Sequence, residues 1–337
     1  MEFLSEYGMF LAKAVTVIIT IAVIIGLAAS SKVKESSSKP LIKHLNDELN
    51  EIKNHFQNLT LSKKELKKLK KEEKQANKKS KDESQLPKVF VLEFNGDIKA
   101  SQANQMKEEI TAILSMDDLP AEVVIKLESG GGMVHQYGFA SSQLERITRK
   151  GIPLTVCVDR VAASGGYMMA AVANKIVAAP FAVLGSIGVI AQVPNFNKVL
   201  KKNDIDFEVH TAGEYKRTLT MFGENTDKAR DKFREDLAEV HVLFKGFIEE
   251  HRPSVDVEKV ANGDVWYGQK AIEVNLVDEL KTSDEYLQEK TLTADVYLIT
   301  QEKKKTLPQK LGIAAQQSVS KGVESVIEKA SFQKLFF

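Results

Sequence analysis

From Lys88 onward, hydrophobic and polar positions alternate in a way that predicts strands separated by helices. The apolar runs "VFVLEF", "EVVIKL" and "IPLTVCV" have the length of buried strands, and the stretches "SQANQMKEEITAIL" and "VHQYGFASSQLERITRK" between them have helical periodicity. Strand and helix in repeated alternation predict an α/β fold with mostly parallel pairing. Further predicted elements are a strand in residues 173–180, a helix in 196–205, a strand in 206–212 and a long helix that ends before Pro253.

The N-terminal part of the chain has a different pattern. Residues 14–31 contain no charged side chain, and the apolar stretch continues towards residue 8 with Lys13 as its only interruption. That length is sufficient to cross a bilayer, so we expect a transmembrane anchor at residues 8–31. A cleaved signal peptide is the alternative, but Glu2 and Glu6 stand where a signal peptide carries basic residues.

Residues 32–87 are expected to form a juxtamembrane helix and a linker. Apolar residues at alternating spacings of three and four predict a seam for helix pairing, either in a short coiled coil or against a neighbouring subunit. Residues 62–81 then contain ten lysines and three glutamates, which predicts a solvated linker that touches anionic lipid headgroups. The seam consists of Ile42, Leu45, Leu49, Ile52, Phe56 and Leu59.

Composition sets further limits on function. The chain has 337 residues, 43% of them hydrophobic, and a formal net charge of +1, so no overall charge favours nucleic acid as a partner. The lysine-rich segment has no interleaved aromatic residues, which also disfavours nucleic-acid binding. Cys157, the single cysteine, excludes an intramolecular disulfide and is interpreted as a small buried apolar residue.

Three glycine-bearing loops follow predicted strands and are candidates for chemistry, and the third of them contains Lys216. In "ESGGGMVHQYG", three consecutive glycines stand between a strand and a helix, where backbone N–H groups can hold an anion. The loop matches neither phosphate-binding glycine motif, so a developing oxyanion is the better candidate than a phosphate. In "VAASGGYMMA", Ser164 begins a helix among small residues, as either a nucleophile or an ordinary helix cap.

A serine nucleophile needs a proton acceptor. Among the six histidines only His135 follows the glycine loop closely, and helix capping or packing explains it equally well. Lys216 in "HTAGEYKRTLTMFGENT" is the alternative base, because it follows a predicted strand and has Tyr215, Met221 and Phe222 nearby to desolvate its amine.

Taken together these motifs resemble the signal peptide peptidase A family of membrane-bound serine–lysine peptidases, and most closely its SohB branch. The resemblance extends over nearly the whole chain and includes "LGSIGVIAQVPNFN" and "WYGQKAIEVNLVDE". It implies that Ser164 is the nucleophile, that Lys216 is the general base and acid, and that Ser186 orients the lysine. It also implies an oxyanion hole of backbone N–H groups around Gly131 and Gly132. The family's usual proline is replaced here by Gly130.

The resemblance further implies a fold like that of the crotonase and Clp-protease superfamily, with stacked ββα units. Members form homo-oligomeric rings in which the catalytic pair can be completed across subunits. We therefore expect a catalytic serine peptidase domain at residues 88–285, a peripheral C-terminal tail at 286–337, no metal or organic cofactor, and unfolded or membrane-derived peptides as substrates. The family places the catalytic domain on the periplasmic face of the bacterial inner membrane, whereas the lysine-rich segment favours the cytoplasmic face.

Two other functions remain compatible with the sequence. A noncatalytic oligomeric membrane scaffold would retain the peptidase fold, although the intact Ser164 and Lys216 argue against it. A crotonase-like acyl-CoA enzyme would share the oxyanion architecture, but it would need neither a serine–lysine pair nor a membrane anchor. A serine-reactive probe and CoA-resin retention distinguish these functions from a peptidase.

Overall fold

The computed structural model describes residues 7–10, 13, 16, 17, 40–69, 71 and 86–301. One compact unit comprises residues 42–300. None of the helices in the described part of the chain has both the length and the apolar character needed to cross a membrane. The predicted anchor at 8–31 and the tail after residue 301 lie almost wholly outside the described residues.

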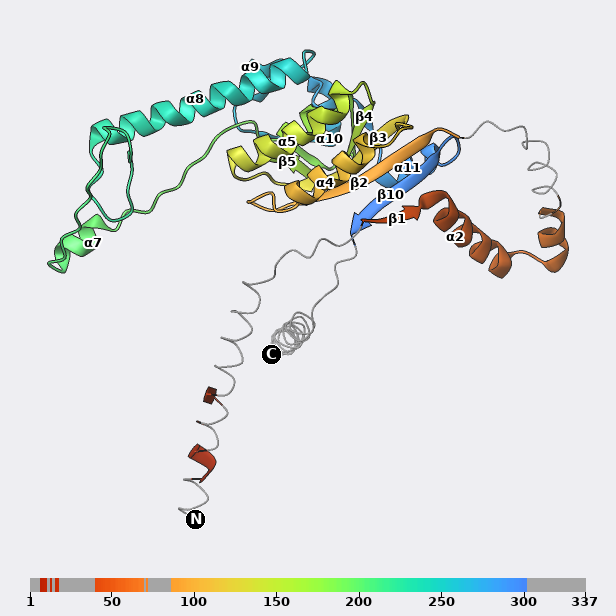
Figure 1. Ribbon diagram of the computed structural model, residues 1–337, viewed down its shortest axis with the longest axis horizontal. Coiled ribbons are helices and arrows are strands. Elements are labelled where there is room, and N and C mark those ends of the chain that lie inside the picture. The colour runs from red at the N-terminus through yellow and green to blue at the C-terminus, as the bar shows by residue number, and fades with distance from the viewer. Residues whose placement is uncertain are drawn as a thin grey trace, which may run out of the picture. The chain divides into compact units, whose positions relative to one another are not determined.

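A ten-stranded sheet forms the centre of residues 42–300, which confirms the α/β prediction (Figure 1). Its main path runs β1–β10–β2–β3–β4–β6–β9. Three further strands lie off this path: β5 pairs with β3, β7 pairs with β5, and β8 pairs with β7. From β10 to β9, and from β3 through β5 to β7, neighbouring strands are parallel; β7 and β8 are antiparallel. The strands are β1 Pro40–His44, β2 Lys88–Gly96, β3 Glu122–Ser129, β4 Leu154–Val158, β5 Val161–Ala163, β6 Lys175–Ala178, β7 Val183–Gly185, β8 Val265–Tyr267, β9 Glu279–Leu280 and β10 Asp295–Gln301.

The helices match the predicted pattern in most places. The amphipathic stretches form helices where periodicity predicted them, and the long helix α8 ends before Pro253. The strand predicted at 206–212 is wrong, because this segment has no regular structure. Its apolar side chains Phe207 and Val209 are exposed, so no neighbouring strand buries them. The helices are α2 Leu45–Thr60, α4 Ala103–Leu114, α5 Val134–Arg149, α6 Gly165–Ala171, α7 Asn197–Lys202, α8 Asp227–His251, α9 Val257–Val260, α10 Gly268–Ala271, the 3₁₀ helix η1 Ile272–Val274 and α11 Ser283–Lys290.

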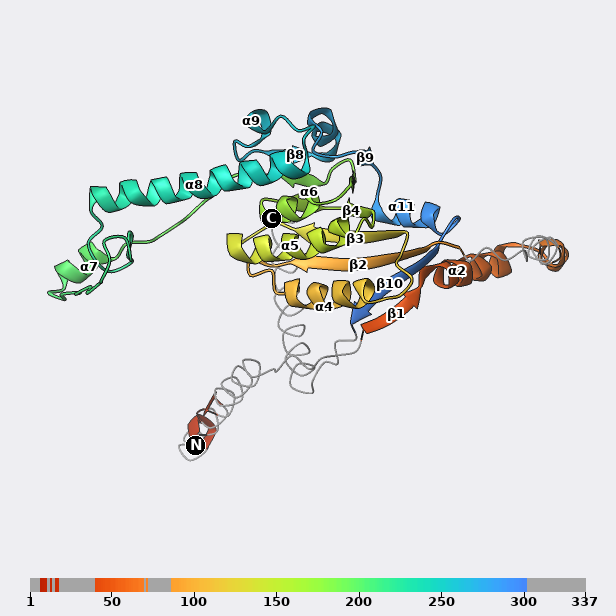
Figure 2. The ribbon, with the colours of Figure 1, turned by 45° about the horizontal axis from the view of Figure 1, so that its top comes forward.

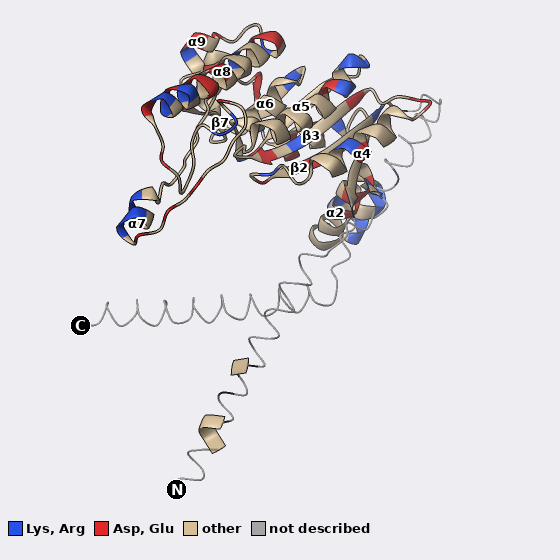
Figure 3. Cartoon of the chain, turned by 60° about the vertical axis from the view of Figure 1, so that its left-hand side comes forward, with Lys and Arg blue, Asp and Glu red and all other residues tan. Residues whose placement is uncertain are grey.

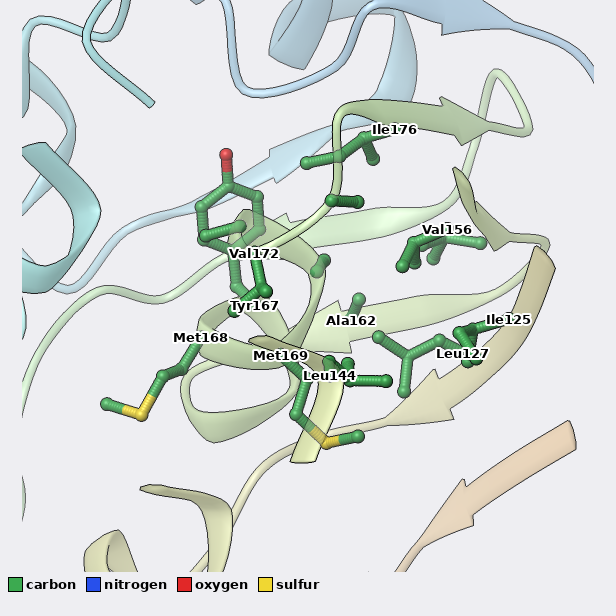
Figure 4. Packing of buried hydrophobic residues seen from close by; sticks show 14 of the residues in the cluster. Ile125, Leu127, Leu144, Val156, Ala162, Tyr167, Met168, Met169, Val172 and Ile176 are labelled. Carbon is green, nitrogen blue, oxygen red and sulfur yellow. The ribbon is translucent and has the colours of Figure 1, made fainter. Parts of the chain in front are cut away.

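Both faces of the sheet are covered by helices. Alternate residues of β2, β3 and β4 form the larger core together with α4, α5 and α6. Figure 2 shows these three helices along the sheet. Within it, Leu127 and Val156 of the sheet pack with Leu144 of α5 and with Met169 of α6 (Figure 4). On the other face, a second, smaller core contains Tyr286 and Leu287 of α11 and the strand residues Val89, Val91, Val124 and Cys157. Burial on both sides explains why these strands read as continuous apolar runs.

The C-terminal boundary of the core requires a correction. The tail predicted from residue 286 begins inside α11, and β10 lies within the sheet, where it pairs with β2 from Asp295↔Lys88 to Ile299↔Leu92. The buried carboxylate of Glu122 accepts a hydrogen bond from the Tyr286 hydroxyl at 2.5 Å. Residues 286–300 therefore belong to the core, because α11 and β10 contribute buried residues to the smaller core and β10 pairs with β2.

The lysine-rich segment also differs from the predicted linker at its start. Residues 63–69 are helical. Ser62 and Glu65 form a capping box: the Glu65 carboxylate accepts from the Ser62 backbone N–H at 2.9 Å, and the Ser62 hydroxyl accepts from the Glu65 N–H at 3.4 Å. The Ser62 hydroxyl also donates to the Glu65 carboxylate at 2.7 Å, and this bond, together with that from the Ser62 N–H, holds the pKa of the Glu65 carboxyl below its ordinary value. The high lysine content predicts a linker here, whereas the capping pair Ser62 and Glu65 starts a helix.

Helix α2 exposes the later residues of the predicted seam, Leu49, Ile52, Phe56 and Leu59. The start of the seam was predicted wrongly, because Ile42 lies in strand β1 and Leu45 packs against the smaller core. Its N-terminal end is fixed to the sheet by Asn46, whose side chain bonds the carbonyls of Thr291 and Ala294 and the N–H of Val296. Beyond that point no residue of α2 is buried, and Phe56 and Leu59 are 63% and 72% exposed. Helix pairing through this seam stays a prediction.

Residues 189–226, here called the arm, connect β7 to α8 and contain α7. Alternating acidic and basic residues cover the N-terminal half of α8 (Figure 3), with ion pairs such as Arg230–Asp227 and Lys232–Asp236. Only Phe244 and Ile248, near the C-terminal end of α8, are buried. Directly after that end, Arg252 makes a two-pronged ion pair with Asp278 at 2.7 and 2.9 Å. The C-terminal end of α8 is thus fixed to the core, whereas the arm and the start of α8 are mostly exposed.

Candidate active site

Three serines stand at the carboxyl ends of three neighbouring parallel strands. Ser129 is the last residue of β3, Ser164 directly follows β5, and Ser186 directly follows β7. The register pairs Ser129 with Ala162, and Ala163 with Gly185, so the three strand ends lie next to one another. Ligands and reacting groups of parallel sheets gather at this edge.

Ser164 has a backbone conformation that is rare for a residue with a side chain. Its φ is +52° and its ψ is −121°, and it occupies the position before the first residue of α6. An ordinary capping serine has an extended backbone and bonds an N–H of the first turn, whereas the Ser164 side chain makes no capping bond. The Ser164 N–H donates to the Gly185 carbonyl at 2.8 Å, which holds the turn to β7. The helix-cap interpretation of Ser164 is therefore not supported, and the strained turn presents its hydroxyl at the strand ends.

The glycine loop lies directly against this serine. Gly131 has a φ of +85°, and a Cβ atom there would stand 2.6 Å from the Gly165 nitrogen, 2.8 Å from the Ala163 carbonyl oxygen and 2.9 Å from the Ser164 Cβ. A Cβ at Gly132 would meet the Ile98 carbonyl oxygen at 2.2 Å. Two of the three consecutive glycines are thus required by close backbone approach, and the loop reaches the serine because it has no side chains there.

The loop offers fewer free donors than its glycine count suggests. The Gly131 N–H donates to the Ser129 hydroxyl oxygen at 3.1 Å. The Gly132 N–H makes no hydrogen bond to any described residue. Gly165, as the first residue of α6, has an N–H with no acceptor inside the helix. The N–H groups of Gly132 and Gly165, one from each loop, are therefore candidates to hold an anion beside Ser164.

Lys216 is not brought to this site within one chain. It lies in the arm between α7 and α8, where its side chain is exposed, and Tyr215, Met221 and Phe222 around it are also exposed. The desolvation expected from these neighbours is absent in the single chain. No hydrogen bond or ion pair between described residues links Lys216 to Ser164. Its N–H donates to the Gly213 carbonyl at 3.2 Å, in a turn where Gly213 has a φ of +97°.

The other residues considered as candidates have different surroundings. His135 is exposed on the first turn of α5. Ser186 has a φ of +50°, and its N–H donates to the Asp264 carbonyl at 2.7 Å, so the end of β7 is a second strained turn beside Ser164. Cys157 is 1% exposed, and burial raises the pKa of its thiol to about 12, which confirms its interpretation as a buried apolar residue.

Three residues of this region were not predicted from the sequence. Gly165 contributes the N–H that follows the nucleophile candidate, and Ser129 and Tyr137 form buried hydrogen bonds below the glycine loop. Ser129 directly precedes the three consecutive glycines and Gly165 directly follows Ser164, so their positions beside these motifs could have indicated a role in the site. Tyr137 gave none, because a tyrosine on the apolar side of a helix is read as core.

Comparisons of the sequence with known proteins agree on one family. The model of peptidase family S49 matches residues 146–297, and that of the S49 N-terminal region matches residues 2–144. The "Probable protease SohB" of Haemophilus influenzae is 46% identical over 332 residues, which cover 94% of each chain. The protein of the same name from Buchnera aphidicola subsp. Acyrthosiphon pisum is 52% identical over 293 residues, covering 85% of this chain and 86% of its own.

Solved structures give more distant matches. The 1510-N membrane-bound stomatin-specific protease, in complex with a substrate peptide, has a TM-score of 0.43 and 14% identity over 67% of this chain and 98% of its own. A member of the enoyl-CoA hydratase/isomerase family has a TM-score of 0.35 and 13% identity over 59% and 69% of the two chains.

Proposed function

This chain belongs to peptidase family S49 and is of the SohB type, and from that premise we propose that it is a membrane-anchored serine endopeptidase that uses Ser164 and Lys216. The observation that carries the proposal is the conformation of Ser164: a strained, non-capping serine at a strand end, with the backbone of Gly131 packed against it. Strain of this kind is retained where a side chain must be presented for chemistry.

The proposed reaction proceeds through an acyl-enzyme. Neutral Lys216 removes the Ser164 hydroxyl proton while the oxygen attacks the scissile carbonyl carbon. The carbonyl oxygen becomes an anion that the oxyanion hole stabilises. The resemblance implies that the N–H groups of Gly131 and Gly132 form this hole. Because the Gly131 N–H already donates to Ser129, we propose that the hole consists of the N–H groups of Gly132 and Gly165. The C–N bond then breaks, Lys216 gives the proton to the leaving amine, and water activated by Lys216 hydrolyses the Ser164 ester.

Lys216 of a neighbouring copy completes the pair in this proposal. Two observations support it: Lys216 is exposed on the arm in its own chain, and the arm carries a cluster of exposed aromatic side chains. Phe222 lies 6.0 Å from Phe196 and 5.6 Å from Phe207 between ring centroids, while all three rings remain about half exposed to solvent. A neighbouring subunit in a homo-oligomeric ring would cover these rings and desolvate Lys216 at the same time.

Anchoring and substrate class complete the proposal. Residues 8–31 would hold the protein in the bacterial inner membrane, with the catalytic domain on the periplasmic face and unfolded or membrane-derived peptides as substrates. Ser186, at the strained turn beside Ser164, would orient Lys216.

A fluorophosphonate probe tests the proposed nucleophile. We expect the full-length protein in detergent to be labelled at Ser164 alone, because only an activated serine reacts with such a probe. Peptide mass spectrometry locates the adduct, and Ser164→Ala is the control that should remain unlabelled. An unlabelled wild-type protein would favour the noncatalytic scaffold, and an adduct on another serine would remove Ser164 from its role.

A further inference from the structure

A chain of hydrogen bonds runs beneath the glycine loop and has no part in the reaction steps above. The Gly131 N–H donates to the Ser129 oxygen at 3.1 Å, the Ser129 and Tyr137 hydroxyls are 2.6 Å apart, and the Tyr137 hydroxyl donates to the Asp97 carbonyl at 2.7 Å. Ser129 is 1% exposed and Tyr137 is fully buried. We call Ser129 and Tyr137 the relay.

The direction of the relay follows from its proton count. A tyrosine hydroxyl has one proton, and the Asp97 carbonyl can only accept it. Tyr137 must then accept from Ser129, so the Ser129 proton is committed to Tyr137 and its oxygen is left to accept from Gly131. Every donor in the chain points the same way, from the glycine loop towards Asp97, and bonds so aligned strengthen one another.

We propose that Ser129 and Tyr137 are positioning residues that set the orientation of the oxyanion hole. Because the Gly131 N–H is held by the Ser129 oxygen, the peptide unit that follows is oriented so that the Gly132 N–H stays free to bind the substrate oxyanion. The inference rests on the proposed peptidase function. It adds two side chains that touch no reacting atom and act through Gly131.

Packing around Tyr137 ties the relay to the nucleophile as well as to the loop. A Cβ at Gly165 would stand 2.4 Å from the Tyr137 Cγ, so the tyrosine ring lies directly against the residue after Ser164. A Cβ at Gly96 would meet the Ser129 oxygen at 2.3 Å and the Tyr137 hydroxyl at 2.5 Å. Tyr137 thus contacts Gly165 with its ring and supports Gly131 with its hydroxyl through Ser129, and both donor loops of the site depend on one side chain.

The turn after β2 is held to the same assembly. The Asp97 carbonyl accepts from Tyr137, and the next carbonyl, that of Ile98, accepts from the Met133 N–H at 2.9 Å. The side chain of Asp97 bonds the N–H and hydroxyl of Ser101, and these bonds lower the pKa of its carboxyl. The acceptor at the end of the relay is therefore itself fixed, as a positioning role requires.

Tyr137→Phe and Ser129→Ala test the relay in the full-length protein. Each removes a buried hydroxyl that no neighbouring side chain replaces. We expect kcat to fall about ten- to a hundred-fold with KM within about two-fold of wild type, because an oxyanion hole acts on the transition state. The inhibition constant of a peptide boronate, whose tetrahedral adduct occupies the hole, should rise by the factor that kcat/KM loses. The double variant should resemble the worse single variant, because both act through one chain of bonds.

Tyr167→Phe is the matched control. Tyr167 is also fully buried and donates to a carbonyl, that of Leu276, at 3.0 Å, but its hydroxyl makes no hydrogen bond to the glycine loop. It should lower the melting temperature as Tyr137→Phe does and leave kcat within about two-fold.

Each outcome decides the inference separately from the proposed function. Unchanged kcat and boronate affinity in Tyr137→Phe and Ser129→Ala would overturn the relay while leaving the peptidase assignment intact. Equal kcat losses in Tyr137→Phe and Tyr167→Phe, or failure of both relay variants to fold, would show that the relay serves stability only. Full activity in Ser164→Ala would instead remove the proposed function on which the inference rests.

Discussion

Replacement of Ser164 by alanine is expected to lower peptide hydrolysis by about 10³- to 10⁶-fold, the range seen when the nucleophile of a serine hydrolase is removed. The strained backbone at φ +52° presents a side chain that makes no capping bond, so its removal should cost little stability. Turnover of a fluorogenic peptide and the melting temperature, both measured on the full-length protein, separate loss of chemistry from loss of fold.

Ser141→Ala is the control for Ser164→Ala. Ser141 is a fully buried serine of α5 whose hydroxyl has no partner among the described residues. It should retain wild-type turnover. Residual activity in Ser164→Ala above about a tenth of wild type would contradict the nucleophile assignment.

A methyl group at Gly131 is expected to reduce kcat/KM by about 10²- to 10³-fold, as much as loss of one oxyanion donor. The added Cβ would stand 2.6 Å from the Gly165 nitrogen and 2.8 Å from the Ala163 carbonyl, at a φ of +85°. Relief of these contacts must separate the glycine loop from the turn of Ser164. The kinetic constants of Gly131→Ala, with its circular dichroism spectrum as a check on folding, measure this effect.

Gly131→Ala introduces both backbone strain at a positive φ and a steric collision, and Gly151→Ala introduces the strain alone. Gly151 has a comparable φ of +75°, but nothing lies within 4 Å of the position of an added Cβ. This variant carries the backbone strain without the collision, so it should lose about 1 kcal/mol of stability and no activity. If Gly131→Ala and Gly151→Ala have the same kinetic constants, the contact between the two loops has no catalytic importance.

Much of the fold could be predicted because the sheet is covered on both faces. Buried parallel strands read as unbroken apolar runs, so β2, β3 and β4 were found from pattern alone. The pattern failed where tertiary contacts decide. Residues 206–212 have a strand-like sequence but no strand to pair with, and β10, which pairs with β2, was assigned to a peripheral tail.

The candidate site was predictable in its parts and not in its assembly. Consecutive glycines and a serine among small residues marked the two loops, because only small residues permit such close backbone approach. The commitment of the Gly131 N–H to Ser129, the position of Tyr137 under both loops and the exposure of Lys216 depend on contacts between distant segments. No local pattern records such contacts.

Mixed oligomers test the pairing of Ser164 with Lys216 most directly. Ser164→Ala and Lys216→Ala subunits are each expected to be inactive alone. If each site takes its serine from one copy and its lysine from the next, subunits mixed in equal amounts before assembly should recover about a quarter of wild-type activity. Co-expression with two affinity tags provides the mixed oligomers, and turnover per subunit is the measurement. Recovery near that fraction is what the account predicts, and mixed oligomers as inactive as their parents would contradict it.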